Sequence, residues 1–281
     1  MESTTPRTFL RIADLLASHG YRIGQQIGEG AYSKVHTTEK LSDGSTYAVK
    51  IVDLSKVRTG YLKHFMPHEL DVITLLKHRN VVETVQIIQD KTYVLQIMEY
   101  ASKGDVLRMI QQHGFIAEEK AKSIFKDVAA GVQYLHDLNI AHRDLKCENI
   151  LIFEDNRAVV SDFGFVKNLD GTSSTNLCRT FCGSTAYASP EVLRGLPYDP
   201  KMNDVWSIGV VLFTMLSGTI PFDDGNVTRM VQKQQSRDYT FPARVVGQSS
   251  CKARQLVYEI LDPDTNSRPT VKTVLESAWL I

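Results

Sequence analysis

A short polar stretch interrupts an apolar run in the segment IAHRDLKCENILI. It brings Asp144, Lys146 and Asn149 close together, and Asp162 follows in SDFG after a hairpin expected to turn at residues 154–156. The oxygens of Asn149 and Asp162 are hard ligands of the kind that Mg²⁺ prefers. Asp144 can orient an attacking hydroxyl and accept its proton, and Lys146 can neutralise charge on a moving phosphoryl group. The pattern therefore predicts a phosphoryl-transfer site in which two loops face one cleft.

A glycine-rich segment earlier in the chain, IGEGAYSKV, could cover the phosphate donor. Gly28 and Gly30 would let backbone N–H groups approach phosphate oxygens closely, and Ser33 stands where a third glycine could sit. In a dinucleotide-binding oxidoreductase such glycines follow a strand and open a helix. Here the continuation KVHTTEKLSDGSTYAVK alternates and turns like a hairpin, so the loop is expected between two strands. This context excludes the oxidoreductase class.

Lys50 ends the second of those strands, in the apolar context YAVK. A lysine on an edge strand can extend its ammonium group to water while its stem stays on the apolar surface. The alternative is an anionic partner, which Glu69 in PHELDVITLLKH could supply. Such a pair would fix Lys50 in position to grip phosphate oxygens.

The chain has two regions with different patterns of apolar residues. Short β-like runs dominate residues 21–98, and one helical pattern, HFMPHELDVITLLKH, interrupts them. From Gly104 onward helical spacing takes over, as in Ile124, Val128, Val132 and Leu135. No internal repeat or low-complexity tract is visible, so a small β-rich lobe followed by a larger helical lobe is expected.

Composition excludes several classes of protein. The 281 residues contain 32 basic and 32 acidic side chains, so no net field would recruit nucleic acid or an anionic membrane. Four irregularly spaced cysteines indicate a reducing compartment rather than a disulfide framework, and their spacing does not favour a structural metal. The N-terminus lacks the apolar core of a secretory signal. The uncharged run 205–222 is interpreted as a buried helix of a soluble protein rather than a membrane span.

Taken in order, the motifs resemble those of protein kinases from Tyr21 to nearly the last residue. They are GEGAYSKV, YAVK, HRDLKCEN, SDFG, SPE at 189–191, DVWSIG at 204–209 and the arginine, Arg268, in DPDTNSRPT. Within that family, GYRIGQQIGEGAYSKV, HRDLKCENIL and TFCGSTAYASPEVLRGLPYDPK most resemble the testis-specific serine/threonine kinases. The subfamily would imply signalling in spermatogenesis.

The resemblance implies an α+β, bilobal protein kinase fold that follows an N-terminal extension of residues 1–20. A small β-rich N-lobe with one major helix would span residues 21–98, a hinge 99–101, and a larger, mainly helical C-lobe 102–281. Glu191 is implied to pair with Arg268 in a structural contact. The chain ends at SAWLI, on the last helix expected of this fold, so regulation is expected in the domain itself or in a separate partner.

The resemblance also implies roles for individual residues, with ATP and Mg²⁺ as cofactors. Val35, Ala48 and Leu151 would sandwich the adenine, Met98 would stand at the back of its pocket, and the backbone of residues 99–101 would read its edge. The implied catalytic residues are Asp144, Lys146 and the ion pair of Lys50 with Glu69, and the implied metal ligands are Asn149 and Asp162. The implied nucleotide contacts are Ile27, Gly28, Glu29, Gly30, Ser33, Val35, Ala48, Lys50, Met98, Glu99, Ala101, Asp105 and Leu151.

Regulation and substrate choice follow from the same resemblance. Thr180 is implied as the activating phosphosite, whose phosphate Arg143 and Lys167 could clamp. Ser173, Ser174 and Thr175 are interpreted as solvated loop residues. Thr185 and Ser189 stand where proline and alanine are usual in the loop that receives the peptide, so they bear on substrate preference.

The position of Lys146 two residues after Asp144 resembles the branch that phosphorylates Ser or Thr rather than Tyr. Asp105 and Glu148 occupy positions where related kinases hold arginine of the substrate, which predicts basic residues before the acceptor. The alternative is that Asp105 only contacts the ATP ribose and Glu148 is a solvated acid.

The expected function is therefore an ATP-dependent serine/threonine protein kinase. A pseudokinase scaffold is the alternative, although such proteins typically lack the lysine, the catalytic aspartate or a metal ligand, all of which are present here. Protein substrates and an upstream activating kinase are the expected partners, with no nucleic acid and no membrane. Oligomeric state is not indicated, and we expect a cytoplasmic protein that could also enter the nucleus.

Overall fold

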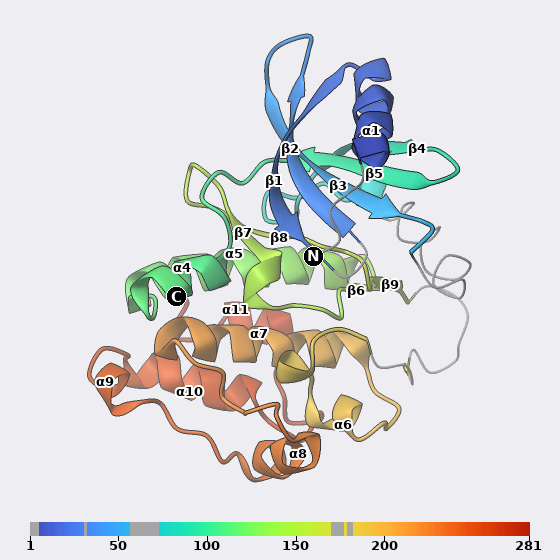
Figure 1. The fold of residues 1–281 in the computed structure, drawn as a ribbon. Helices are drawn as coiled ribbons and strands as arrows, with labels where there is room; N and C mark the ends of the chain where they lie inside the picture. Colours follow the sequence, from blue (N-terminus) through green and yellow to red (C-terminus); the bar gives the residue numbers. More distant parts are fainter. Residues whose placement is uncertain (1–5, 31–32, 57–72, 170–176, 179–181) are drawn as a thin grey trace. The chain divides into compact units, whose positions relative to one another are not determined.

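The computed structural model describes residues 6–30, 33–56, 73–169, 177–178 and 182–281 (Figure 1). Its contacts divide the chain into two compact units. Unit 1 comprises Met1–Lys77 and Val82–Ala101, and unit 2 comprises His78–Val81 and Ser102–Ile281. The expected division into a β-rich part and a mainly helical part is confirmed.

Unit 1 contains a five-stranded sheet in the order β1-β2-β3-β5-β4, and each neighbouring pair of strands is antiparallel. The alternating runs identified in the sequence form these strands, because β-branched and apolar residues suit a sheet with one or two buried faces. The bounds are β1 Tyr21–Glu29, β2 Ser33–Lys40, β3 Thr46–Asp53, β4 Thr84–Gln89 and β5 Tyr93–Glu99.

A helix that the sequence reasoning did not predict, α1 (Pro6–Ser18), lies on one face of this sheet (Figure 1). Its residues Ile12 and Leu16 are buried against Val49 and Ile51 of β3 and against Leu95 and Ile97 of β5. The helical spacing Phe9, Ile12, Leu16 was a readable signal for it. An exposed ion pair, Arg11 to Asp90 at 2.6 Å, joins the helix to the end of β4.

The predicted helix HFMPHELDVITLLKH falls mostly on residues 57–72, which lie outside the described part of the chain. Residues 73–75 are helical, and Ile73 and Leu76 are buried.

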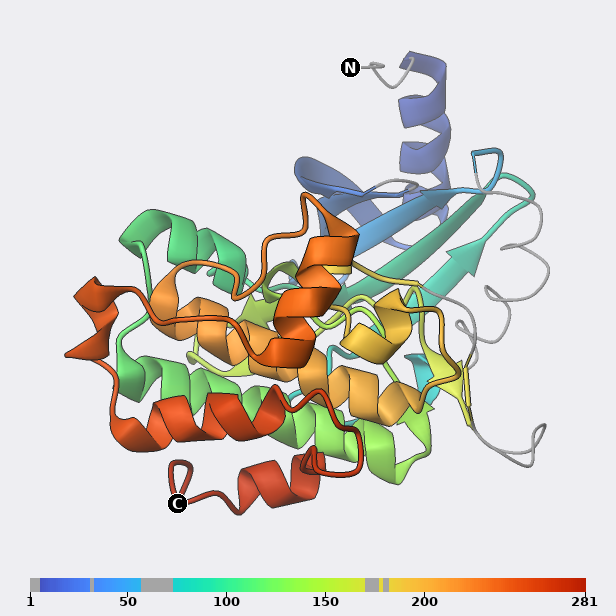
Figure 2. The ribbon, with the colours of Figure 1, turned by 90° about the horizontal axis from the view of Figure 1, so that it is seen from below.

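Unit 2 is built around α7 (Pro200–Ser217), which packs against α5 and α10 (Figure 2). Nearly all residues of α7 are buried, which explains why its sequence carries no charge after Asp204 and confirms the prediction of a core helix. Asp199 caps its N-terminus, and Gly218 ends it in the left-handed conformation, where a side chain would collide with Gly114. None of the described helices is both long and apolar enough to cross a membrane.

The remaining elements of unit 2 surround that helix. The predicted periodic helix is α5, and the predicted hairpin is β7 with β8, turning through Asn156 in the left-handed conformation. The helices are α4 Val106–His113, α5 Glu118–Asp137, α6 Pro190–Leu193, α8 Val227–Ser236, α9 Ala243–Val246, α10 Cys251–Ile260 and α11 Val271–Leu275. The strands are β6 Ile140–Ala141, β7 Ile150–Ile152, β8 Ala158–Val160 and β9 Lys167–Asn168, and two 3₁₀ turns span Cys147–Asn149 and Thr185–Tyr187.

Candidate active site

The loop that carries Asp144 is shaped by a buried carboxylate. Asp204, in α7, is fully buried and accepts the backbone N–H groups of His142 and Arg143, each at 2.8 Å. Arg143 has a φ of 67°, an unusual backbone conformation for a residue with a side chain. His136 of α5 donates through Nε2 to the same carboxylate at 3.0 Å. These bonds hold the loop in the bend that precedes Asp144.

His142 connects this loop to the next one. Its Nδ1 accepts the backbone N–H of Asp144 at 3.2 Å, so Nε2 carries the proton and donates to the carbonyl of Ser161 at 3.0 Å. The ring of Phe163 packs on the imidazole, with 5.2 Å between centroids. The two polar loops predicted from sequence therefore do lie side by side, and His142 joins them.

The carboxylate of Asp144 is buried and receives hydrogen bonds on both oxygens. Ser184 donates to Oδ1 through its backbone N–H and its hydroxyl, each at 3.0 Å. Lys146 places Nζ 2.9 Å from Oδ2, and the Asn149 amide reaches Oδ2 at 3.2 Å and the Asp144 carbonyl at 2.8 Å. Lys146 also donates to the Ser184 hydroxyl at 3.0 Å. The predicted cluster of Asp144, Lys146 and Asn149 is thus brought together.

Ser184 is a residue of this cluster that sequence reasoning missed. It lies inside TFCGSTAYASPE, but nothing in its spacing marks it as a partner of Asp144. The preceding Gly183 has a φ of 94°, and a side chain there would collide with the carbonyl of Arg143 and lie 3.2 Å from Asp144 Oδ1. Only glycine allows this close approach.

A magnesium site fits the chemistry of the residues present. The Asn149 amide nitrogen donates to Asp144, which leaves the amide oxygen as the group that would face a metal. Asp162 is exposed, has a φ of 63°, and accepts the Gly164 N–H through Oδ1 at 3.3 Å. No group of three or more His, Cys, Asp or Glu among the described residues could hold a metal. One carboxylate and one amide are nevertheless enough protein ligands for Mg²⁺ when phosphate oxygens and water complete its coordination shell.

Strand register gathers the predicted nucleotide contacts of unit 1. Val35 pairs with Lys50, and Ala48 pairs with Met98 across β3 and β5. Directly paired residues share one face of a sheet, so these four side chains lie on the face opposite α1. The partner proposed for Lys50, Glu69, is outside the described residues.

The glycine loop and the predicted hinge also follow from strand pairing. Gly28 pairs with Val35 and Glu29 with Lys34, and the Gly30 N–H donates to the Ser33 carbonyl at 2.8 Å. This confirms a loop between two strands. Ile27 is exposed, Glu99 pairs with Tyr47, and Ala101 ends the unit.

Asp105 and Leu151, both predicted nucleotide contacts, form a β-bridge in unit 2. Asp105 also caps α4, because its carboxylate accepts the Arg108 N–H at 2.8 Å. Glu148, beside Asn149, is exposed. Its neighbour Cys147 is fully buried, and burial raises the pKa of that thiol to about 12.

The two basic residues assigned to phosphate recognition have other partners. Arg143 donates through Nε to the Phe165 carbonyl at 2.6 Å, and the Lys167 ammonium lies 3.1 Å from the sulfur of Cys178. Thr180 lies outside the described residues, as do Ser173, Ser174 and Thr175.

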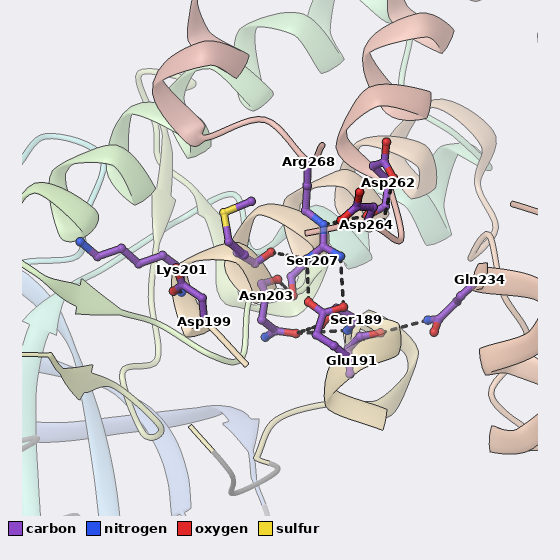
Figure 3. A network of polar contacts seen from close by, with 12 residues as sticks. Ser189, Glu191, Asp199, Lys201, Asn203, Ser207, Gln234, Asp262, Asp264 and Arg268 are labelled. Carbon is purple, nitrogen blue, oxygen red and sulfur yellow. Dashed lines mark hydrogen bonds and ion pairs between the residues drawn. The ribbon is translucent and has the colours of Figure 1, made fainter. Parts of the chain in front are cut away.

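The segment after Ser184 is fastened to α7 and α8 by buried polar side chains (Figure 3). Ser189 is fully buried and donates to Asn203, so it does not contact solvent as a substrate-facing residue would. The predicted pair of Glu191 and Arg268 is present, with bidentate contacts of 2.8 and 3.1 Å. Arg268 is buried and also donates to the carbonyls of Asp262 and Met202.

Comparison with known proteins agrees with this geometry. A family profile described as protein kinase domain matches residues 21–280. Testis-specific serine/threonine-protein kinase 2 of Mus musculus is 38% identical over 273 residues, which cover 95% of this chain and 75% of that protein. Testis-specific serine/threonine-protein kinase 3 of Mus musculus is 39% identical over 270 residues, covering 95% and 98%. CBL-interacting protein kinase 26 of Oryza sativa subsp. japonica is 34% identical over 259 residues, covering 92% and 52%.

Proposed function

The chain belongs to the protein kinase family and is a serine/threonine protein kinase, and we propose that it transfers the γ-phosphoryl group of ATP to Ser and Thr hydroxyls of protein substrates. The observation that carries the proposal is the Asp144 carboxylate, which Ser184, Lys146 and Asn149 hold in one orientation. A carboxylate fixed in this way can orient a hydroxyl and accept its proton. Lys146, beside it, would offset charge on the moving phosphoryl group.

Asn149 and Asp162 are the residues that would hold Mg²⁺, and Lys50 would grip phosphate oxygens. When bound, Mg²⁺ supplies neutralisation of phosphate charge. Gly28 and Gly30 support nucleotide binding because the absence of a side chain lets a phosphate approach the backbone closely. The sheet face carrying Val35 and Ala48 supports it because it offers an apolar surface.

The test is transfer of label from γ-labelled ATP to a generic basic protein. The wild type is expected to label serine and threonine, and Asp162→Asn is expected to abolish transfer because it removes the negative charge of the carboxylate proposed to hold the metal. Asp144→Asn keeps the shape of the side chain but removes the base, and it is expected to retain ATP binding while losing transfer. ATP binding without transfer by the wild type would support a pseudokinase instead, and phosphotyrosine as the main product would contradict the acceptor class.

We further propose that substrates carry arginine two or three residues before the acceptor. Glu148 supports this because its carboxylate is exposed beside Asn149, and an arginine fork can meet a carboxylate with two hydrogen bonds. One such contact is worth about 1.5 to 3 kcal/mol, which corresponds to about tenfold or more in efficiency at low substrate. Arginine peptides are expected to exceed their alanine versions by about that factor, and Glu148→Arg is expected to erase the advantage. Asp105 is a less clean test because it also caps α4.

We also propose that an upstream kinase phosphorylates Thr180 and that Arg143 and Lys167 receive the phosphate. Both side chains would then exchange their present partners, Phe165 and Cys178, for a doubly charged group. Thr180→Ala is expected to lower activity strongly, whereas Ser174→Ala is not. Equal activity of the wild type phosphorylated at Thr180 and of Thr180→Ala would refute the switch.

We propose that the protein is cytoplasmic and can also enter the nucleus. The cysteine usage, which is typical of a reducing compartment, supports this location, and cell fractionation tests it.

A further inference from the structure

The consecutive residues Tyr187, Ala188 and Ser189 are each held by a different buried side chain. Figure 3 labels the three holding residues, Asn203, Ser207 and Gln234. The carbonyl of Tyr187 accepts the hydroxyl of Ser207 at 2.9 Å. The carbonyl of Ala188 accepts the side-chain amide of Gln234 at 3.0 Å. Ser189 donates its backbone N–H and its hydroxyl to Asn203 Oδ1, at 3.1 and 2.9 Å. The holding side chains come from α7 and α8, which are remote in sequence from the segment they hold.

Ser189 explains why Asn203 is needed. The hydroxyl stands where related kinases usually carry an alanine, and at this position it has no access to water. A buried hydroxyl must find an acceptor within the protein. Asn203, itself 5% exposed, supplies one oxygen that serves both donors of Ser189. The pair therefore fixes both the backbone and the side chain of the residue before Pro190.

Gln234 provides an independent attachment from α8. Its side chain is fully buried, and its amide donates to Ala188, while its Oε1 has no hydrogen-bond partner among the described residues. A glutamine buried with one polar atom unsatisfied is a poor core residue. The contact with Ala188 is the interaction that this buried amide gains.

The other end of the same segment touches the reacting group. Ser184 binds the catalytic aspartate through two hydrogen bonds, and the short 3₁₀ turn Thr185–Tyr187 connects it to the residues held by α7 and α8. The segment is therefore attached to Asp144 at one end and to two helices at the other. A shift of the segment at either attachment would therefore change its position relative to Asp144.

We propose that Asn203 and Gln234 are positioning residues for the peptide substrate, acting through Ser189 and Ala188. The inference rests on the proposed function, because it requires that the chain phosphorylates a peptide and that the segment 184–189 receives it, as the family resemblance implies. Neither residue is expected to touch ATP, the metal or the acceptor hydroxyl. Their loss should therefore weaken peptide binding and leave the handling of ATP intact.

The hydrogen-bond pattern predicts an order among variants. Asn203→Ala leaves two buried donors of Ser189, its backbone N–H and its hydroxyl, without an acceptor. Ser189→Ala removes only the hydroxyl, so Asn203 Oδ1 still accepts the backbone N–H of residue 189. Asn203→Ala is expected to raise the KM for a substrate peptide about tenfold, or about 1.4 kcal/mol. Ser189→Ala is expected to raise it about twofold. Combining the two changes should recover part of the loss, because one unsatisfied donor is removed.

The experiment measures peptide KM, ATP KM and ATP hydrolysis without peptide for each variant, together with its thermal unfolding. Gln234→Met, which keeps the length of the side chain but removes the donor, is expected to raise peptide KM about fivefold with unchanged ATP hydrolysis. Thr214→Val is the matched control, since the Thr214 hydroxyl is buried in α7 and donates to the carbonyl of Val210 in the same helix rather than to the segment 184–189. This control is expected to leave all three kinetic values unchanged.

The outcomes separate the inference from the proposed function. Unchanged peptide KM in folded Asn203→Ala and Gln234→Met overturns the inference, as does an equal fall in peptide phosphorylation and peptide-free ATP hydrolysis. If Asn203→Ala does not fold, Gln234→Met and Ser189→Ala decide the matter by the same criterion. A wild-type protein that phosphorylates no peptide of a mixed library would instead overturn the proposed function, and this inference with it.

Discussion

Lys50 in unit 1 and Asp144 in unit 2 are held by different physical means. Lys50 is placed by the register of β3 against β2 and β5, to which many backbone hydrogen bonds contribute. Asp144 is placed by a few side-chain contacts, chiefly those of Asp204 with the loop backbone and of Ser184 with the carboxylate itself. The sheet therefore distributes the positioning of Lys50 over many residues, whereas the loop concentrates the positioning of Asp144 in single buried groups. Single substitutions should therefore have unequal effects in the two units.

The largest effect is expected from Asp204→Ala. The change leaves the N–H groups of His142 and Arg143 and the Nε2 of His136 without their shared buried acceptor. Removing a buried charged partner typically costs about 3 to 5 kcal/mol of stability. The two lost bonds to the loop backbone, those of His142 and Arg143, should each cost about 1.4 kcal/mol or more of the energy that keeps Asp144 in position. Because 1.4 kcal/mol corresponds to a factor of about ten, the rate of phosphotransfer should fall by at least about a hundredfold. Thermal unfolding and label transfer measure both effects, and a variant that retains near-normal turnover would contradict the idea of concentrated control.

A smaller effect is expected from Leu16→Ala in unit 1. Leu16 is fully buried between α1 and the sheet, so truncation leaves a cavity and should cost about 2 to 4 kcal/mol of the free energy of unfolding. The strand register does not depend on this side chain, so the ATP KM of the remaining folded protein should stay near that of the wild type. Denaturant unfolding gives the stability and initial rates give the KM. A large rise in ATP KM without loss of stability would show that α1 shapes the nucleotide face directly.

A still smaller effect is expected from Thr38→Val in the same sheet. Thr38 is buried and donates to the carbonyl of Arg22 at 3.0 Å, but the strands around it are also joined by backbone bonds. The loss of one neutral hydrogen bond should cost about 1 kcal/mol. The unfolding midpoints of Thr38→Val and Asp204→Ala are compared. A smaller decrease for Thr38→Val would show that a buried polar side chain contributes less to stability in the sheet than in the loop. Similar losses for the two variants would argue against the distinction.

The smallest perturbation is chemical and uses the thiols of unit 2. Burial raises the pKa of Cys147 from 9.0 to about 12, so the thiol of the folded protein stays neutral at pH 8 to 9. Because the unfolded chain would lose this proton above pH 9, the free energy of unfolding should decrease only as the pH rises from 9 to 12. Iodoacetamide at pH 8 should therefore modify exposed Cys251 and spare Cys147 in the native protein, without loss of activity. Mass spectrometry of the digested protein identifies the labelled thiol. Rapid labelling of Cys147 would show that the catalytic loop opens readily.

The same distinction explains how far the sequence could be interpreted. Alternation in YRIGQQIGEG and TYAVKIVDL predicts the strands, and motif order predicts Asp144, Lys146, Asn149 and Asp162, because these signals are local. The contacts of Ser184, Asn203 and Gln234 are not local, and a serine or glutamine that will be buried looks like any surface residue in a sequence. Residue type alone could not show that Ser189 is buried and donates to Asn203.

The helix α1 was missed for a different reason. Its apolar spacing is visible in the sequence, but it precedes the family motifs, which start at Tyr21, so residues 1–20 were predicted only as an N-terminal extension. In the structure, Ile12 and Leu16 of α1 complete the apolar cluster on this face of the sheet.

That face has a practical consequence for anyone producing the protein. A fragment cut at Tyr21, where the family profile begins, would uncover Val49, Ile51, Leu95 and Ile97 on adjacent strands. An apolar sheet face of this kind promotes self-association and precipitation. Boundaries for recombinant expression are therefore better chosen from the surface that α1 buries than from the limits of sequence similarity.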